Sequence, residues 1–276
     1  MNAPSAPSAP PYNTHMKAMP PPSYNYSLSP PTKSEKFTRI MDKYEITSKF
    51  SEKLFLLEDY DIVFLFDDSS SMNTPVKGSD GLWTRWTELQ YNAKIILDIA
   101  NVFNGNFGVN IHFLNRPVFR QVVQEQQLVY IFKDSPLGRT PLTKKCEEIF
   151  ELYRATEKPV LLIIATDGVP TNRQGDTDLK SFRELLKNKD HSKFFISFLA
   201  CSDNASDIGY LNKLDNQIPG IDTLDDYQSE LKEVLRAQGR GFKYTHGDHI
   251  VRLLLGPICP ELDALDEPRC FDCVLL

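Results

Sequence analysis

Side chains that carry oxygen atoms follow two strongly apolar segments of this sequence. Asp67, Ser69 and Ser71 form a D-x-S-x-S pattern directly after one apolar segment, and Asp167 comes within two residues of the end of another. In an open parallel sheet, the carboxyl ends of the strands form the edge at which ligands bind. Two carboxylates brought together there would repel each other unless a cation or protons intervened. The pattern therefore predicts a group of oxygen ligands at one edge of a sheet.

A threonine just before a helical segment adds a third hydroxyl group. Thr140 lies in the sequence GRTPL, where its side chain could cap the following helix or bind a cation. Carboxylate and hydroxyl oxygens suit Mg²⁺ or Mn²⁺, and no thiolate or imidazole is close to them in the sequence. The DSSS run by itself is also typical of loops in which Asp and Ser side chains stabilise a turn. Together with Thr140 and Asp167, however, it indicates a Mg²⁺ (or Mn²⁺) site.

The segments that must position these side chains alternate between strand-like and helix-like patterns. Nearly continuous apolar runs predict buried strands at 61–66, 108–114, 160–165 and 194–200. Segment 118–123 is a candidate antiparallel edge strand, and a weak strand lies near 220–222. Apolar residues at helical spacing predict helices at 88–103, 124–132, 142–153, 179–186, 211–218 and 225–235. This alternation predicts an α/β fold with three layers, built on a doubly wound and mostly parallel sheet.

The two ends of the chain differ from its centre. Nine of the 19 prolines fall in the first 31 residues, which lack the aliphatic side chains needed to offset the entropy lost on folding. We therefore predict a disordered, proline-rich arm over residues 1–35 and a folded domain over residues 38–238. Residues 239–276 are less regular and are predicted to form a C-terminal extension that packs on the domain at first and then continues as a tail.

The oxygen ligands, with their order and spacing, resemble the metal-ion-dependent adhesion site (MIDAS) of von Willebrand factor A (VWA) domains. The resemblance covers about residues 58–238 and includes all five positions of that site. It implies that three hydroxyls bind the ion and that two carboxylates bind it directly or through water. The matched residues are Asp67, Ser69, Ser71, Thr140 and Asp167.

The resemblance also implies a function in protein binding. One coordination position of the cation is left for an acidic side chain of a protein partner, so a chelator should abolish binding. Integrin-type members of the family carry further carboxylates after the first motif, whereas this chain continues Met72-Asn73-Thr74-Pro75. An adjacent second metal ion is therefore not expected here.

A catalytic function fits the sequence less well. Phosphatases of the haloacid dehalogenase type need D-x-D, and Ser69 occupies the third position of the pattern here. There is also no G-x-S-x-G motif and no Walker loop in the sequence. We predict a non-catalytic interaction module; the alternative enzyme is a metal-dependent phosphoester hydrolase that uses the same cation to activate water.

The last four residues, CVLL, match a C-a-a-X box with Leu in the final position. This match predicts a geranylgeranyl group on Cys273. A single lipid anchors a protein weakly, so a second signal is expected, and Cys270 is a candidate palmitoylation site. A chance cysteine beside aliphatic residues would give the same letters. If it is modified, the tail places the protein at the cytosolic face of a membrane.

Two kinds of short motif occur in the proline-rich arm. Pro4-Ser5-Ala6-Pro7 resembles the P-[ST]-A-P ligands of an ESCRT adaptor domain, and Pro21-Pro22-Ser23-Tyr24 resembles the P-P-x-Y ligands of WW domains. Prolines hold such a segment extended at low entropic cost, although proline-rich composition alone also generates these patterns. They raise a further alternative, a scaffold that recruits ubiquitin-ligase or ESCRT factors.

Composition excludes several other classes of protein. The 276 residues include 31 Lys and Arg against 37 Asp and Glu, so the net charge of −6 argues against a nucleic-acid partner. The longest clean apolar run, 160–165, is far shorter than the roughly 20 residues that span a bilayer. The first thirty residues contain no apolar stretch typical of a signal peptide. The five cysteines are widely spaced and predict no disulfide framework, so we expect a cytoplasmic protein.

Overall fold

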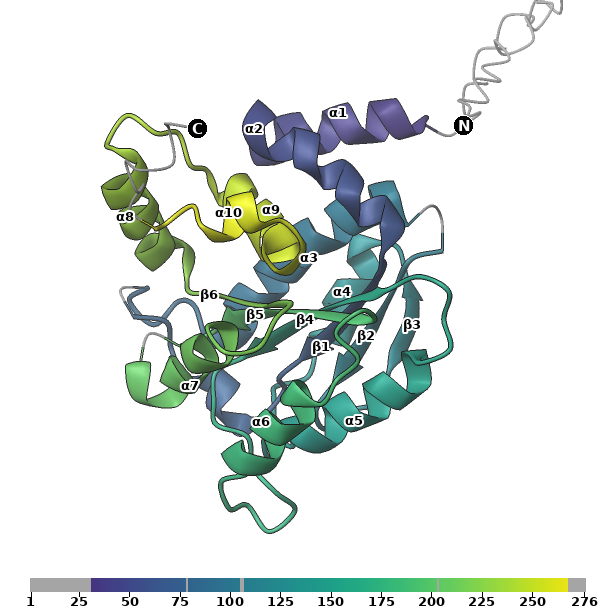
Figure 1. Ribbon diagram of the computed structural model, residues 1–276, viewed down its shortest axis with the longest axis vertical. Helices are drawn as coiled ribbons and strands as arrows, with labels where there is room; N and C mark the ends of the chain where they lie inside the picture. The colour runs from purple at the N-terminus through teal and green to yellow at the C-terminus, as the bar shows by residue number, and fades with distance from the viewer. Residues whose placement is uncertain (1–30, 78, 105–106, 203, 268–276) are drawn as a thin grey trace, which may run out of the picture. The chain divides into compact units, whose positions relative to one another are not determined.

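The computed structural model describes residues 31–77, 79–104, 107–202 and 204–267. The fold described below belongs to the second of two units into which the chain divides, Lys33–Leu276 (Figure 1). Most of the predicted arm, both of its motifs, and Cys270 and Cys273 lie outside the described residues. A first helix begins at Lys33, shortly before the predicted end of the arm.

A six-stranded sheet forms the centre of the second unit, in the order β3-β2-β1-β4-β5-β6 (Figure 1). Neighbouring strands are parallel except β2 and β3, which pair antiparallel as predicted for the edge strand. The doubly wound, mostly parallel α/β fold predicted from the sequence is confirmed. The strands are β1 (Asp61–Phe66), β2 (Val109–Phe113), β3 (Phe119–Val122), β4 (Val160–Thr166), β5 (Phe194–Ala200) and β6 (Ile221–Leu224).

Helices cover both faces of this sheet (Figure 1). The α-helices are α1 (Lys33–Tyr44), α2 (Ser48–Ser51), α3 (Arg85–Phe103), α4 (Glu125–Ile131), α5 (Leu142–Tyr153), α6 (Leu179–Lys187), α7 (Ala205–Asp215), α8 (Tyr227–Gln238), α9 (His246–Leu255) and α10 (Pro260–Asp263). The 3₁₀ helices are η1 (Glu52–Asp59), η2 (Ser70–Asn73) and η3 (Gly256–Ile258). Of the predicted helices, α5 has the predicted bounds, whereas α7 begins six residues earlier than predicted.

Alternation along the strands divides the core into two clusters. Phe64 and Phe66 of β1 belong to one cluster, whereas Val63 and Leu65 belong to the other, because successive side chains of a strand point to opposite faces. Both clusters are apolar, so the central strands are buried on both faces, and all of β4 is buried. This burial explains why the central strands read as continuous apolar runs rather than as alternating ones.

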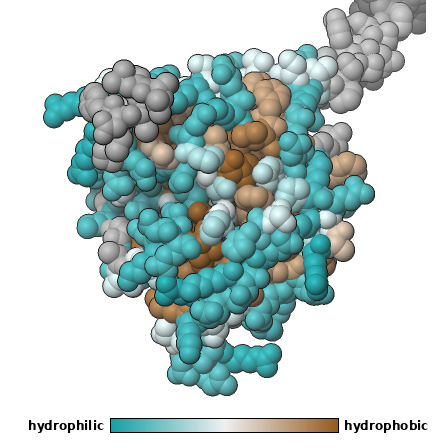
Figure 2. Space-filling view, in the orientation of Figure 1, coloured by the Kyte–Doolittle hydropathy of each residue, from teal (hydrophilic) through white to brown (hydrophobic). Residues whose placement is uncertain are grey.

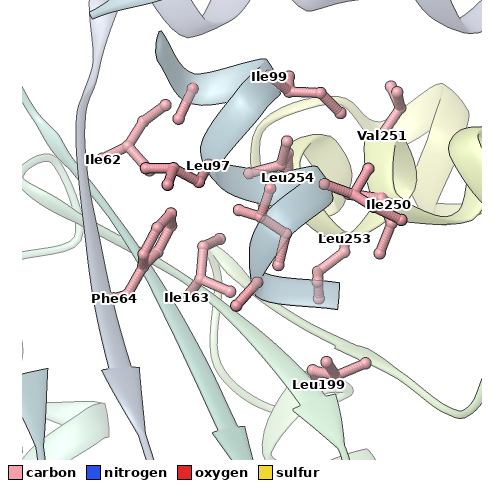
Figure 3. Packing of buried hydrophobic residues seen from close by; sticks show 14 of the residues in the cluster. Ile62, Phe64, Leu97, Ile99, Ile163, Leu199, Ile250, Val251, Leu253 and Leu254 are labelled. Carbon is pink, nitrogen blue, oxygen red and sulfur yellow. The ribbon is translucent and has the colours of Figure 1, made fainter. Parts of the chain in front are cut away.

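Helix α9 belongs to the core, although it lies beyond residue 238, where we predicted the folded domain to end. Every residue from Gly247 to Leu255 is buried. Figure 3 shows Leu253 and Leu254 of α9 in one cluster with Leu97 of α3 and residues of the sheet. A helix that is buried nearly all round does not present the single apolar stripe by which surface helices are recognised.

The surface is mainly polar on the face drawn in Figure 2, with hydrophobic areas of limited size. Several large apolar side chains are nevertheless exposed, among them Leu82, Phe107 and Leu137. Across the described ranges, none of the helices combines the length and the apolar character needed to cross a membrane.

Substitution of Leu254 tests the place of α9 in the core. Leu254 is completely buried, so Leu254→Ala should lower the free energy of unfolding by about 3 kcal/mol, measured by urea denaturation. Leu152→Ala is the matched control, since Leu152 is 49% exposed on α5 and should lose well under about 1 kcal/mol. Equal effects of the two substitutions would show that α9 does not contribute to the folded core.

Candidate metal centre

The structure gathers the five predicted ligand residues at the carboxyl ends of β1 and β4. Ser69 Oγ lies 3.0 Å from Ser71 Oγ, and Ser71 Oγ donates a hydrogen bond of 2.7 Å to Asp167 Oδ1. A Cβ atom on Gly168 would lie 3.7 Å from Thr140 Oγ1 and 3.9 Å from Ser71 Oγ, so these two hydroxyls flank one small space.

The turn after β1 is formed by Asp67 and ends in the 3₁₀ helix η2. The backbone N–H of Ser69 donates to Asp67 Oδ1 at 2.8 Å, which reverses the chain directly after the strand. Ser69 is the N-cap of η2, yet its side chain caps no backbone N–H and contacts Ser71 instead. Met72 is buried and anchors η2 in the core. Both serine hydroxyls are therefore directed to the site rather than used in local structure.

Thr140 does not cap α5, which was one of its two predicted roles. The N-cap of α5 is Pro141, and no side chain caps the helix. Thr140 is fixed through its backbone, which donates from N to Thr171 Oγ1 and accepts at O from the N–H of Thr171 and of Leu142. Within the described part of the chain its hydroxyl has no hydrogen-bond partner, so that oxygen is available to a ligand.

Two further residues belong to the site and were not predicted. Thr166, the last residue of β4, donates a hydrogen bond of 2.7 Å to Asp67 Oδ2. Arg85, the first residue of α3, forms an ion pair of 2.8 Å with Asp167 Oδ2 and donates to Ser202 Oγ at 2.9 Å. A cation in the first turn of a helix opposes the helix dipole, and this local mismatch was the available sign that Arg85 has a distant partner.

Asp68, between the two motif positions, faces away from the site. Its carboxylate is buried, pairs with Arg116 Nε at 2.9 Å and accepts the backbone N–H of Asn115 at 2.8 Å. Asp68 thus connects the end of β1 to the segment that follows β2. Its negative charge is balanced by Arg116 and is not available to a cation at the site.

The two carboxylates of the site differ in how their charge is balanced. Arg85 balances Asp167, whereas Asp67 has no basic partner and accepts hydrogen bonds from the N–H and the hydroxyl of Ser69 and from the hydroxyl of Thr166. Burial, followed by the nearby charge of Asp167, raises the pKa of Asp67 to about 7, against the lowering effect of those hydrogen bonds. A buried carboxylate beside a second one, surrounded by three hydroxyls, fits the oxygen ligands that Mg²⁺ and Mn²⁺ prefer.

No protein-family model matches the chain, and a search of curated proteins also found no match. Among solved structures, a mutant of the PilB minor pilin from Streptococcus sanguinis has a TM-score of 0.48 at 12% identity over 74% of this chain and 62% of the pilin. The pilus adhesin SpaC from Lactobacillus rhamnosus GG has a TM-score of 0.45 at 13% identity over 71% of this chain and 31% of the adhesin. The ArnB paralog VWA2 from Sulfolobus acidocaldarius has a TM-score of 0.37 at 15% identity over 66% of this chain and 45% of that protein. The chain therefore spans less than two thirds of each protein, and similarities this weak bear on neither its family nor its function.

Removal of the Asp67 charge should stabilise the protein when no divalent cation is present. Between about pH 4 and pH 7 the folded state holds a proton on Asp67 that the unfolded chain has released. The stabilisation that comes from this bound proton is complete below pH 4 and is lost as the pH rises through 7. In chelator at pH 8, Asp67→Asn should therefore raise the free energy of unfolding by on the order of 2 kcal/mol, and by less at pH 5.

The control for this measurement is Asp68→Asn, which changes a neighbouring carboxylate that is equally buried. It leaves Arg116 without its ion-pair partner and should lower stability at both pH values. If Asp67→Asn lowers the free energy of unfolding in chelator at pH 8, as Asp68→Asn should, the charge of Asp67 does not destabilise the folded protein.

Proposed function

We propose that this chain is a VWA-type, non-catalytic interaction module that binds an acidic side chain of a protein partner through Mg²⁺ (or Mn²⁺) at a MIDAS. The observation that carries the proposal is the convergence of two carboxylates and three hydroxyls at the carboxyl edge of a doubly wound sheet. The hydroxyl of Thr140, which has no hydrogen-bond partner among the described residues, supports it further.

Each residue of the site has a distinct part in this proposal. The hydroxyls of Ser69, Ser71 and Thr140 would be neutral ligands, and Asp67 and Asp167 would supply negative charge directly or through water. A cation bound there would supply an open coordination position for one more oxygen. Arg85 holds Asp167 by Oδ2 and leaves Oδ1 directed at Ser71, so it orients this carboxylate.

The charge of the loaded site favours an acidic ligand. With a divalent cation bound, the positive charges of the ion and Arg85 outnumber the negative charges of Asp67 and Asp167 by one. The loaded site therefore has a net positive charge. An incoming Glu or Asp side chain would balance that charge, whereas a basic side chain would be repelled. The expectation of an acidic partner therefore agrees with the ion pair between Arg85 and Asp167.

The surroundings of the site suit contact with another protein. Leu137 is 77% exposed, and its backbone N–H donates to Asp68 O at 2.8 Å, which places it beside the turn after β1. An apolar side chain next to a charged anchor is a common arrangement in protein interfaces. The four histidines in the described part of the fold are engaged elsewhere, so none is placed here as a general base: His112 contacts Tyr153, His191 the backbone oxygen of Lys187, His246 the ring of Tyr227, and His249 the hydroxyl of Tyr244.

Calorimetry on the full-length chain tests the metal site. The wild type should bind Mg²⁺ and Mn²⁺ saturably, and Asp67→Ala combined with Thr140→Ala should weaken binding by at least about 100-fold, because a charge and a ligand are lost. Thr143→Ala is the matched control, since Thr143 is also buried but lies inside α5. If the wild type binds no more tightly than the double variant, there is no metal-bridged interaction at this site.

We also propose that the tail is lipid-anchored and that the arm motifs recruit WW-domain or ESCRT partners. Cys270, Cys273 and both arm motifs lie outside the described residues, so these proposals depend on sequence patterns alone. A lipid on Cys273 would hold the folded domain near the cytosolic face of a membrane and so raise its local concentration toward partners there.

Mass spectrometry of the chain expressed in eukaryotic cells tests the lipid anchor. The C-terminal peptide should carry a geranylgeranyl group on Cys273, and Cys273→Ser should move the protein from the membrane fraction to the soluble fraction. Cys270→Ser should keep the prenyl group but reduce membrane retention, because one lipid anchors weakly. An unmodified C-terminal peptide in the wild type would exclude the anchor.

A further inference from the structure

A groove lies on the surface between α6 and α7 (Figure 1). The ring of Phe182 in α6 contacts the ring of Tyr210 in α7, with 6.5 Å between their centroids, so the two helices are joined by packing. The groove has a volume of about 390 Å³, which falls within the range of about 300–1,000 Å³ found for ligand pockets. Its lining residues come from both helices: Leu179, Lys180, Arg183, Glu184, Tyr210, Lys213 and Leu214. The space is therefore large enough to hold side chains of a binding partner.

The inner part of the groove is apolar and held in place. Leu214 belongs to the hydrophobic core and is 4% exposed, whereas Leu179 and Tyr210 are partly buried. The hydroxyl of Tyr210 donates a hydrogen bond of 3.0 Å to the backbone oxygen of Gly168, which fixes the ring. An apolar side chain that entered the groove would leave water and contact these residues, and its burial would favour binding.

The rim of the groove carries an excess of positive charge. Lys180 and Lys213 are exposed, lie on opposite helices and form no ion pair with any residue that the structure describes. Arg183 donates a hydrogen bond to the neutral side chain of a glutamine. Glu184 is the one acidic residue among those that line the groove, and it already pairs with Lys187 at 3.7 Å. The lining residues thus present three cations and one carboxylate, a balance that favours an acidic ligand.

We propose that this groove binds a short amphipathic segment of a protein partner, with apolar side chains between the two helices and Asp or Glu side chains beside Lys180 and Lys213. Peptide recognition in which apolar side chains enter a hydrophobic groove recurs among binding proteins. The concave shape favours such a segment over a membrane. A flat anionic surface would contact the basic rim but would leave the apolar residues of the groove uncovered.

The groove adjoins the candidate metal centre but is separate from it. Gly168, to which Tyr210 is hydrogen-bonded, follows Asp167 directly, and a Cβ atom on it would lie 3.7 Å from Thr140 Oγ1. One partner could therefore occupy both places, with one acidic side chain at the cation and others at the rim, and the two contacts together would raise its affinity. Binding in the groove needs no cation, so it does not depend on the proposed MIDAS.

A library of random peptides displayed on phage tests the proposal, with full-length Asp67→Ala in chelator as the target so that no metal ion contributes. The selected peptides should combine Leu or aromatic residues with Asp or Glu. In fluorescence anisotropy, Lys180→Glu combined with Lys213→Glu in the same protein should bind the tightest peptide at least about 10-fold more weakly, and added salt should weaken binding to the parent protein. Lys232→Glu combined with Lys243→Glu is the matched control, because it makes the same charge change at exposed lysines outside the groove and should bind the peptide as before.

A second variant tests the apolar part of the groove. Leu179→Ser should weaken binding of the same peptide by about 5-fold or more, because apolar contact area is lost. Thermal melts should give every variant nearly the Tm of its parent, since Lys180 and Lys213 have no ion pair to lose among the described residues. The proposal is overturned if no acidic peptides are selected, or if the Lys180→Glu and Lys213→Glu pair or Leu179→Ser binds the peptide as tightly as the control. It is also overturned if vesicles of phosphatidylcholine and phosphatidylserine bind through the two lysines while no peptide does, which is the result expected of a membrane-binding surface.

Discussion

Repulsion between two carboxylates at the ends of adjacent strands is the constraint on which the candidate metal centre depends. Asp67 and Asp167 are both buried, and the parallel pairing of β1 with β4 leaves them no freedom to separate. The surrounding structure reduces this repulsion on one side only, through Arg85 on Asp167. What remains on Asp67 is the charge that a cation would balance.

The buried acidic residues of the described chain fall into two classes. Asp68, Asp167 and Glu230 are each paired with an arginine, and Asp248 accepts hydrogen bonds from Thr47 and Thr245. Asp67 has no basic partner and accepts hydrogen bonds from Ser69 and Thr166, whereas the carboxyl of Asp222 pairs with that of Asp263 and lies near the charge of Arg252. Since a buried charge must be balanced, Asp67 is the position where a cation is expected, at the metal site proposed above.

The fold holds Asp67 and Asp222 in place through packing that involves distant parts of the chain. Helix α3 carries Arg85 at its first turn and packs through its apolar face on α9 and the sheet (Figure 3). Helix α9 in turn carries Arg252, which binds both Glu230 of α8 and the backbone of α10. Core packing and charge balance therefore depend on the same two helices, so a change in α9 affects the surroundings of Asp222 as well as the core.

The sequence by itself determined the strands, most of the helices, the parallel topology and the five residues gathered at the sheet edge. These features are local: continuous apolar runs, helical spacing, and oxygen-bearing side chains at strand ends. Only the tertiary structure decided the place of α9 in the core, the role of Arg85 on Asp167 and the pairing of Arg252 with Glu230. Each of these depends on contacts between segments far apart in the chain, and no local pattern specifies which charged side chain will meet which when the chain folds.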